Sequence, residues 1–245
     1  MNWMEGPLVG FDTETTGTDV RNDRIITAAL VFKPSYTAEP LKYEWMINTG
    51  EEIPDGATKI HGITNERMQE EGKNPQEVLN EVNYLLHQFT TQQGAAVVAF
   101  NAAYDLTILR EDTLRAGGVF AEALYQAPVI DPLVIDKQTD KYRKGKRTLS
   151  ATAEMFGIDS AGAHGALADV IMTMRVAYKL AAQYPKLQVP SDRIHEWQKE
   201  WKNQQELSFA EYKRKTDPNW EAQTDCWPIH PVRAVQEENT GGVTW

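Results

Sequence analysis

Two carboxylates stand two residues apart near the start of the chain, at the end of a predicted strand. A period of two points Asp12 and Glu14 to the same face of a sheet. Carboxylates held side by side repel one another, and a bound cation removes that cost. A solvated surface pair is the alternative reading. The apolar residues before the pair and the polar turn at 15–17 favour a metal site.

Three further residues capable of chemistry follow at the ends of predicted elements. Asp105 comes just after a predicted strand at 95–100, where ligands gather in open α/β sheets. Asp169 lies one turn into a later predicted helix, and His164 lies in the glycine-rich segment before it. Taken alone, each has a simpler reading: Asp105 favoured by the helix dipole, Asp169 as a surface charge and His164 as a solvated side chain. Taken with Asp12, Asp105 is a candidate ligand on the opposite side of a shared metal site.

The surrounding segments resemble the motifs of a known family. The three exonuclease motifs of the DEDDh, or DnaQ-like, 3′–5′ exonucleases look like FDTETTG at 11–17, NAAYDLTIL at 101–109 and HGALADVIMT at 164–173. That group includes the proofreading subunit of bacterial DNA polymerase III. The family's His-Gly-Ile-Thr loop after the third strand is similar to residues 60–64. The resemblance covers about residues 7–183 and keeps the order and approximate spacing of the motifs.

This resemblance implies a ribonuclease H-like exonuclease fold that holds two divalent metal ions, Mg²⁺, with Mn²⁺ expected to support activity as well. Asp12 would bridge both ions, Glu14 and Asp169 would complete the shell of one, and Asp105 would serve the other. His164 would be the general base. Two such ions ~3.5–4 Å apart polarise the attacking water and stabilise the leaving 3′-oxygen.

The resemblance also implies contacts to the substrate. Thr15 and Thr16 would contact the terminal sugar, His61 would lie near the last nucleotide, and Phe100 and Asn101 would lie beside them. Many relatives carry histidine where this chain has Phe100. Because the four carboxylates and His164 are intact, we expect Phe100 to change local packing or base stacking and to leave activity in place.

Nucleic acid is the implied substrate. We expect hydrolysis of phosphodiester bonds at the 3′ end of single-stranded or frayed DNA, releasing nucleoside monophosphates. An RNA-trimming 3′–5′ exoribonuclease is the alternative, since the choice rests on contacts to the 2′-hydroxyl, and the His-Gly-Ile-Thr element favours DNA. A non-catalytic binding or polymerase-associated module is the alternative of another class. The intact carboxylates count against it, because a disused site has no reason to keep four mutually repelling charges.

Composition and charge limit the classes of protein to which this chain can belong. A formal charge of −10 argues against coating nucleic acid through basicity, although bound cations would invert the field near the carboxylates. Residues 137–147 carry six basic side chains against Asp140, which reads as a solvated loop or as a phosphate contact. One cysteine, Cys226, excludes an internal disulfide and a cysteine-based zinc site. With no signal peptide or membrane segment in view, we expect a soluble cytoplasmic protein.

Hydrophobic periodicity supplies the elements that must position these residues. Strands are predicted at 7–12, 25–33, 41–48, 95–100 and 127–130, and helices at 75–89, 104–115, 148–156 and 165–183. The basic segment 137–147, which follows the strand at 127–130, is read as a loop. The order predicts an α/β fold with a mixed central sheet flanked by helices.

Pro185 and Pro190 mark a boundary in the sequence. We expect an exonuclease domain at 1–184 and a C-terminal extension at 185–245, with a helix at about 191–215 that begins at an N-cap Ser191 and is followed by an irregular tail. Trp197 and Trp201 share one face of that helix. They either pin the extension onto the core, stack on bases or contact a DNA polymerase.

Overall fold

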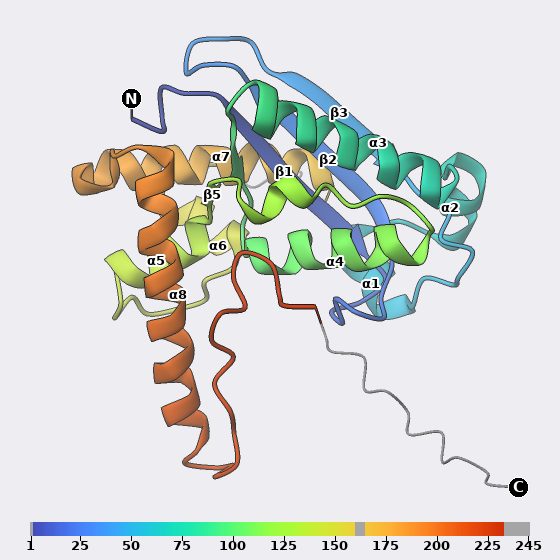
Figure 1. Cartoon of the computed structure of the whole chain (residues 1–245). Coiled ribbons are helices and arrows are strands. Elements are labelled where there is room, and N and C mark those ends of the chain that lie inside the picture. The colour runs from blue at the N-terminus through green and yellow to red at the C-terminus, as the bar shows by residue number, and fades with distance from the viewer. Residues whose placement is uncertain (1, 160–164, 233–245) are drawn as a thin grey trace, which may run out of the picture.

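A five-stranded mixed sheet lies at the centre of the computed structural model, which describes residues 2–159 and 165–232 (Figure 1). Its strand order is β3-β2-β1-β4-β5. The strands β1 (Leu8–Thr15), β2 (Ile25–Lys33) and β3 (Leu41–Met46) form an antiparallel meander. The short strands β4 (Ala96–Val98) and β5 (Val129–Ile130) add in parallel on the other side of β1. The predicted mixed sheet is therefore confirmed.

Helices cover both faces of this sheet, and β1 sends alternate side chains to each layer. Val9 and Phe11 pack with α3 (Pro75–His87) and α4 (Ala102–Arg115) in one hydrophobic cluster. Leu8 packs with α6 (Leu149–Met155) and α7 (Ala166–Gln183) in a second cluster. Because the period of a strand is two, Gly10, Asp12 and Glu14 share the face of Leu8 and point toward the α7 layer.

Three short helices were missed by the sequence prediction, and two predicted loops are therefore wrong at their first residues. His61 does not lie in a loop but ends α1 (Asp55–His61), and three residues separate it from the start of α2 (Asn65–Glu71). Residues 132–139 form α5 (Pro132–Thr139), so Lys137 of the basic run is helical. Side-chain caps explain two of these helices: Thr64 accepts from the Arg67 N–H, and Asp131 accepts from the Leu133 N–H. Each helix is too short to show a clear apolar period.

The longer helices match their predicted positions, with shifts at the ends. Helix α3 begins at Pro75 as predicted, is capped by Asn74 and continues into a π-helical turn, η1 (Gln88–Gln92). Helix α4 begins two residues earlier than predicted. Single 3₁₀ turns, η2 (Glu122–Tyr125) and η3 (Pro185–Leu187), precede β5 and α8. Within the described part of the chain, no helix combines the length and apolar character that crossing a membrane requires.

The C-terminal extension packs against the open edge of β5. Helix α8 (Ser191–Lys213) begins after Pro190, so Pro190 takes the N-cap position predicted for Ser191. Two side chains of α8 replace the missing strand partner: His195 Nδ1 accepts from the Val129 N–H, and the Gln198 amide bonds the Val129 carbonyl and the Asp131 N–H. Residues 214–232 then return alongside α8 toward α4 (Figure 1).

Tryptophans fasten this extension to the core. Trp227 is 5% exposed and donates its indole N–H to Asp131. Trp197 and Trp201 are half-buried against the cluster under α7, with ring centroids 5.9 Å apart. This packing favours the anchoring interpretation of the two residues. The division into domains at residues 184 and 185 stays a prediction.

Candidate active site

Asp12, Glu14 and Asp169 form an acidic cluster at the C-terminal end of β1. One carboxylate oxygen from each side chain lies within 4.8 Å of the other two. Asp12 and Glu14 come from alternate positions of the strand, as the sequence predicted, and Asp169 comes from the first turn of α7. All three side chains are half-buried. The arrangement offers an all-oxygen donor set, which suits a hard divalent cation such as Mg²⁺.

The absence of a side chain at Gly10 lets α7 approach β1 closely. A Cβ atom at this position would lie 2.5 Å from Val170 Cγ1 and 2.9 Å from Met174 Sδ. Val170 follows Asp169 directly, so the close contact at Gly10 also fixes the depth at which Asp169 meets Asp12. The cluster therefore depends on a residue two positions before its first carboxylate.

Asp105 reaches the same end of β1 from the other side. Strand β4 stops at Val98, and the chain turns through Asn101, which has a positive φ of 65°, into α4. Asp105 is 4% exposed, and one of its oxygens accepts hydrogen bonds from the N–H and the hydroxyl of Thr13. Asp105 lies outside the group of three that share the 4.8 Å distance, yet its charge acts on Asp12.

Burial and mutual repulsion disfavour the charged forms of these carboxylates. Burial raises the pKa of Asp12 well above its ordinary value, and the charges of Asp105, Asp169 and Glu14 raise it further. The pKa of Glu14 rises to about 7 through burial and the charge of Asp169. Burial also raises the pKa of Asp105 to about 7, although the bonds from Thr13 oppose the rise. Divalent cations would offset this repulsion, so the electrostatics fit a metal site.

The threonines predicted to meet the terminal sugar belong to a hydrogen-bonded turn. The hydroxyls of Thr15 and Tyr104 lie 2.5 Å apart, and each is also within hydrogen-bond distance of the Gly17 carbonyl. Because each hydroxyl has one proton, one of the two donates to the other while its partner donates to Gly17. Thr16 is buried and donates its hydroxyl to Asp23. Tyr104 was not predicted as a site residue. Its place one residue before Asp105, on the helix beside the turn, is the signal that points to it.

His61 lies beneath a small pocket next to the start of α7. It is 7% exposed, and its Nδ1 accepts from the Ile63 N–H. The pocket, of about 240 Å³, is also lined by Thr27, Gly165 and Ala166. Burial lowers the pKa of His61, and the backbone of Thr15 opposes that shift. The structure therefore brings His61 near Thr15 and the first residues of α7.

Phe100 and Asn101, which were also predicted to contact the substrate, lie at the turn before α4. Phe100 is half-buried and Asn101 is exposed. The Asn101 N–H donates to Asp131. His164 lies outside the described residues.

Asp131 is a central polar residue that the sequence reading missed. It is 1% exposed, and its carboxylate accepts hydrogen bonds from the backbone of Asn101, Ala102 and Leu133 and from the Trp227 indole. These donors lie at the start of α4, at the start of α5 and within the C-terminal extension. One buried carboxylate thus joins the helix of Asp105 to the C-terminal segment.

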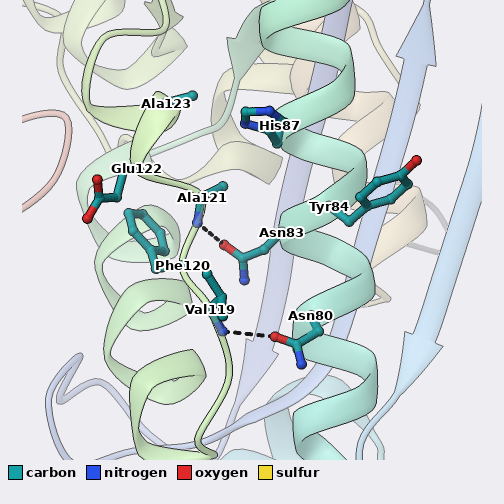
Figure 2. Close-up of a pocket in the computed structure, with 9 residues that line it drawn as sticks. All are labelled: Asn80, Asn83, Tyr84, His87, Val119, Phe120, Ala121, Glu122 and Ala123. Atoms are coloured by element: carbon teal, nitrogen blue, oxygen red, sulfur yellow. Dashed lines mark hydrogen bonds between the residues drawn. The ribbon is translucent and has the colours of Figure 1, made fainter.

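A separate pocket of about 600 Å³ lies between α3 and the segment before η2, away from the acidic cluster (Figure 2). Asn80 and Asn83 accept from the backbone N–H groups of Val119 and Ala121 there, which fastens the segment to α3. Glu122 is the one carboxylate among the residues that line it. This pocket lacks the clustered ligands that a metal centre needs.

Residues 9–177 match the family model RNase_T, described as Exonuclease. A DNA polymerase III subunit epsilon-like protein of Rhodobacter capsulatus is 30% identical over 71% of this chain and 23% of its own length. The DNA polymerase III subunit epsilon of Rickettsia conorii is 25% identical over 69% of this chain and 71% of its own length. The chain thus spans less than a quarter of the first of these relatives.

Solved structures of exonuclease I share the fold. One matches with a TM-score of 0.65 at 20% identity, covering 84% of this chain and 46% of that one. E. coli exonuclease I in complex with a dT13 oligonucleotide matches with a TM-score of 0.62 at 21% identity, covering 75% and 42%. The predicted ribonuclease H-like architecture is confirmed by this likeness, which extends to the fold alone.

Proposed function

We propose, from the premise that this chain belongs to the RNase_T exonuclease family, that it removes nucleotides from the 3′ ends of single-stranded or frayed DNA with the help of two divalent metal ions. The resemblance to DnaQ-like exonucleases is confirmed by the family match and by the epsilon subunits among the relatives. The prediction of an exonuclease is confirmed at the level of the family. The polarity, the substrate and the metal count belong to the proposal.

The acidic cluster carries this proposal. Asp12, Glu14 and Asp169 offer oxygens within 4.8 Å of one another, and Asp105 acts on Asp12 from the opposite side. In the proposed arrangement Asp12 would be a ligand of both ions, Glu14 and Asp169 would hold one, and Asp105 would hold the other. Bound in this way, Mg²⁺ would polarise the attacking water and stabilise the leaving 3′-oxygen. Mn²⁺ is expected to replace it, since it accepts the same oxygen ligands.

His164 is the proposed general base. An imidazole with an ordinary pKa of ~6.5 accepts a proton from water near neutral pH. The support for His164 is its position in the motif: Gly165, the next residue, precedes the helix of Asp169. No covalent intermediate with the protein is required.

The terminal nucleotide is proposed to lie between the turn at 15–17 and the His61 pocket. Both places adjoin the acidic cluster, and the pocket is closed on one side by Gly165 and Ala166. Since the hydroxyls of Thr15 and Thr16 already bond within the turn, we expect them to shape it and to contact the sugar as acceptors. Phe100 and Asn101 border the start of α4, where a neighbouring base would stack.

DNA is favoured over RNA by the names of the relatives. The curated relatives are DNA polymerase III proteins, and E. coli exonuclease I was crystallised with a DNA oligonucleotide. A DNA polymerase that binds through residues 185–245 stays a prediction of the sequence. Cytoplasmic location stays a prediction as well.

Digestion of matched oligonucleotides tests the proposal. DNA and RNA single strands labelled at the 5′ end are incubated with the full chain in Mg²⁺, Mn²⁺ or EDTA. We expect a metal-dependent ladder that shortens from the 3′ end, faster on DNA, and absent for Asp12→Ala. Glu39→Ala is the matched control, because Glu39 is an exposed carboxylate outside the cluster. Faster digestion of RNA would assign the exoribonuclease alternative, and folded protein that cleaves neither strand would favour the binding module.

A further inference from the structure

A groove lies between the C-terminal end of α5 and the second half of α8, outside the acidic cluster. Its volume is about 490 Å³. Figure 1 shows α8 passing beside α5 and continuing beyond the sheet. The lining combines cations, amides and aromatic rings, among them Lys137, Lys141, Arg147, Gln205, Phe209 and Tyr212. Its one carboxylate, Glu206, forms an ion pair with Lys202 at 2.7 Å. Neither the family motifs nor the proposed reaction uses this surface.

Positive charge gathers in the groove although the chain carries a formal charge of −10. Arg147 forms an ion pair with Asp136 at 2.6 Å, which offsets part of its positive charge. Among the described residues, Lys137 and Lys141 make no ion pair within 4.0 Å. Lys141 is exposed. On an acidic protein, local cations of this kind attract an anionic ligand and repel a cationic one.

Exposed aromatic rings border the same groove. Phe209 is 46% exposed and Tyr212 is 66% exposed, and their spacing of three places them on one face of α8. Lysines accompany the rings: Lys213 lies 5.6 Å from the Phe209 ring centre, and Lys215 lies 5.8 Å from that of Tyr212. Proteins that bind single-stranded nucleic acid without regard to sequence combine aromatic rings, on which the bases stack, with cations that contact the phosphates.

The groove is fixed relative to the acidic cluster. Gln205 Nε2 donates to the Val134 carbonyl, which ties α8 to α5. Helix α5 has eight residues and so spans ~12 Å from its cap, Asp131. Asp131 in turn bonds the first residues of α4, the helix that carries Asp105. A strand that reaches from the carboxylates to the groove would therefore meet a rigid surface.

We propose that the groove between α5 and α8 binds the single-stranded nucleic acid upstream of the 3′ end, with Lys137 and Lys141 at phosphates and Phe209 and Tyr212 stacked on bases. This inference rests on the proposed function for the identity of the strand. It assigns the C-terminal extension a part in holding the substrate.

Binding measured without catalysis tests this inference. The full chain in EDTA is titrated into fluorescein-labelled oligo(dT) of about 16 nucleotides, a length that such grooves accommodate, and anisotropy gives Kd. The double variant Lys141→Gln/Tyr212→Ala is expected to bind about tenfold more weakly or worse, since one stacked base and one phosphate contact are lost. The slope of log affinity against log salt should become shallower by about 0.7.

Two kinds of control separate binding from folding. The conservative double variant Lys141→Arg/Tyr212→Phe keeps the charge and the ring, so its Kd should equal that of the wild type. The double variant Tyr84→Ala/Lys186→Gln removes an exposed ring and an exposed cation outside the groove, and its Kd should not change either. Thermal melting of all variants checks that each is folded.

The outcomes for the groove and for the reaction are distinguishable. An unchanged Kd and salt slope for Lys141→Gln/Tyr212→Ala would overturn the proposal that the groove binds nucleic acid, whether or not the chain is active as an exonuclease. Hydrolysis by the wild type of a p-nitrophenyl ester of thymidine monophosphate in Mg²⁺, a substrate with a single nucleotide, tests the reaction separately. Failure to hydrolyse it would count against the proposed function and leave the binding result standing.

Discussion

Thr13 donates both its backbone N–H and its hydroxyl to one oxygen of Asp105, at 3.1 and 2.7 Å. Strand β4 pairs with β1 only as far as Gly10, so the next part of that edge of β1 has no strand beside it. Asp105 takes the place of the absent strand partner. The orientation of this carboxylate, and therefore its approach to Asp12, depends on a residue that is not itself acidic.

Replacing Thr13 with valine tests this dependence. Thr13→Val keeps the shape and the backbone bond but removes the hydroxyl donor, and a hydrogen bond to a charged group contributes roughly 1.5–3 kcal/mol. We expect about a tenfold or greater loss of kcat/KM and a higher Mg²⁺ requirement. Thr13→Ser keeps the donor and should retain most activity. Equal activity of Thr13→Val and Thr13→Ser would show that the hydroxyl does not position Asp105.

The contact between β1 and α7 leads to a prediction about stability. Gly10→Ala places a Cβ 2.5 Å from Val170 Cγ1, and overpacking of this kind costs typically ~1–3 kcal/mol. Urea unfolding should show that loss. Because the closest clash is with a methyl group of Val170, Val170→Ala in the same chain should lower the cost of Gly10→Ala, although the contact with Met174 Sδ at 2.9 Å remains. A double variant whose loss is the sum of the two single losses would contradict this account.

The raised pKa of Glu14 predicts a pH dependence of the metal-free protein. Its pKa is about 7 in the fold and 4.5 ordinarily, so between these values the unfolded chain binds fewer protons than the folded one. The contribution of Glu14 to stability in EDTA is then full below pH ~4.5 and is lost as pH rises toward ~7, a fall of at most about 3 kcal/mol. Scanning calorimetry measures the slope, which Glu14→Gln should flatten.

The same calorimetry in the presence of Mg²⁺ gives a second test. Metal binding requires ionised carboxylates, so stabilisation by Mg²⁺ should grow as pH rises through the same interval. A wild-type Tm that is independent of pH in EDTA, or a Mg²⁺ effect that shrinks with rising pH, would contradict the assignment.

Strand periodicity made most of the site predictable from the sequence. The alternation in β1 places Asp12 and Glu14 on one face, and the long apolar periods of α3 and α7 fix the helical layers on both sides of the sheet. Asp169 could be placed near Asp12 only through the family motifs, because the contact depends on the packing of α7 against Gly10. That packing joins residues far apart in the chain.

Short-range caps and long-range polar bonds account for what the sequence did not predict. Helices α1, α2 and α5 have seven or eight residues each, too few for a clear apolar period. Asp131 looked like a residue at the start of a loop, since its partners Ala102, Gln198 and Trp227 are distant in sequence. Tyr104 gained its role only when the turn after β1 folded beside α4.

Asp131 yields the last prediction, because one buried carboxylate accepts from α4, α5 and the extension. Asp131→Asn keeps the size but replaces one acceptor oxygen with a donor, which opposes the N–H groups that now face it. A buried donor left without a partner costs ~1–3 kcal/mol. We expect lower stability in urea and, since α4 carries Asp105, a lower kcat on oligonucleotides.

Trp227→Phe is the matched control: it removes one donor from Asp131 but leaves the start of α4 bonded, so it should lower stability and preserve kcat. A similar fall of kcat in both variants would mean that Asp131 acts through the extension and not through α4.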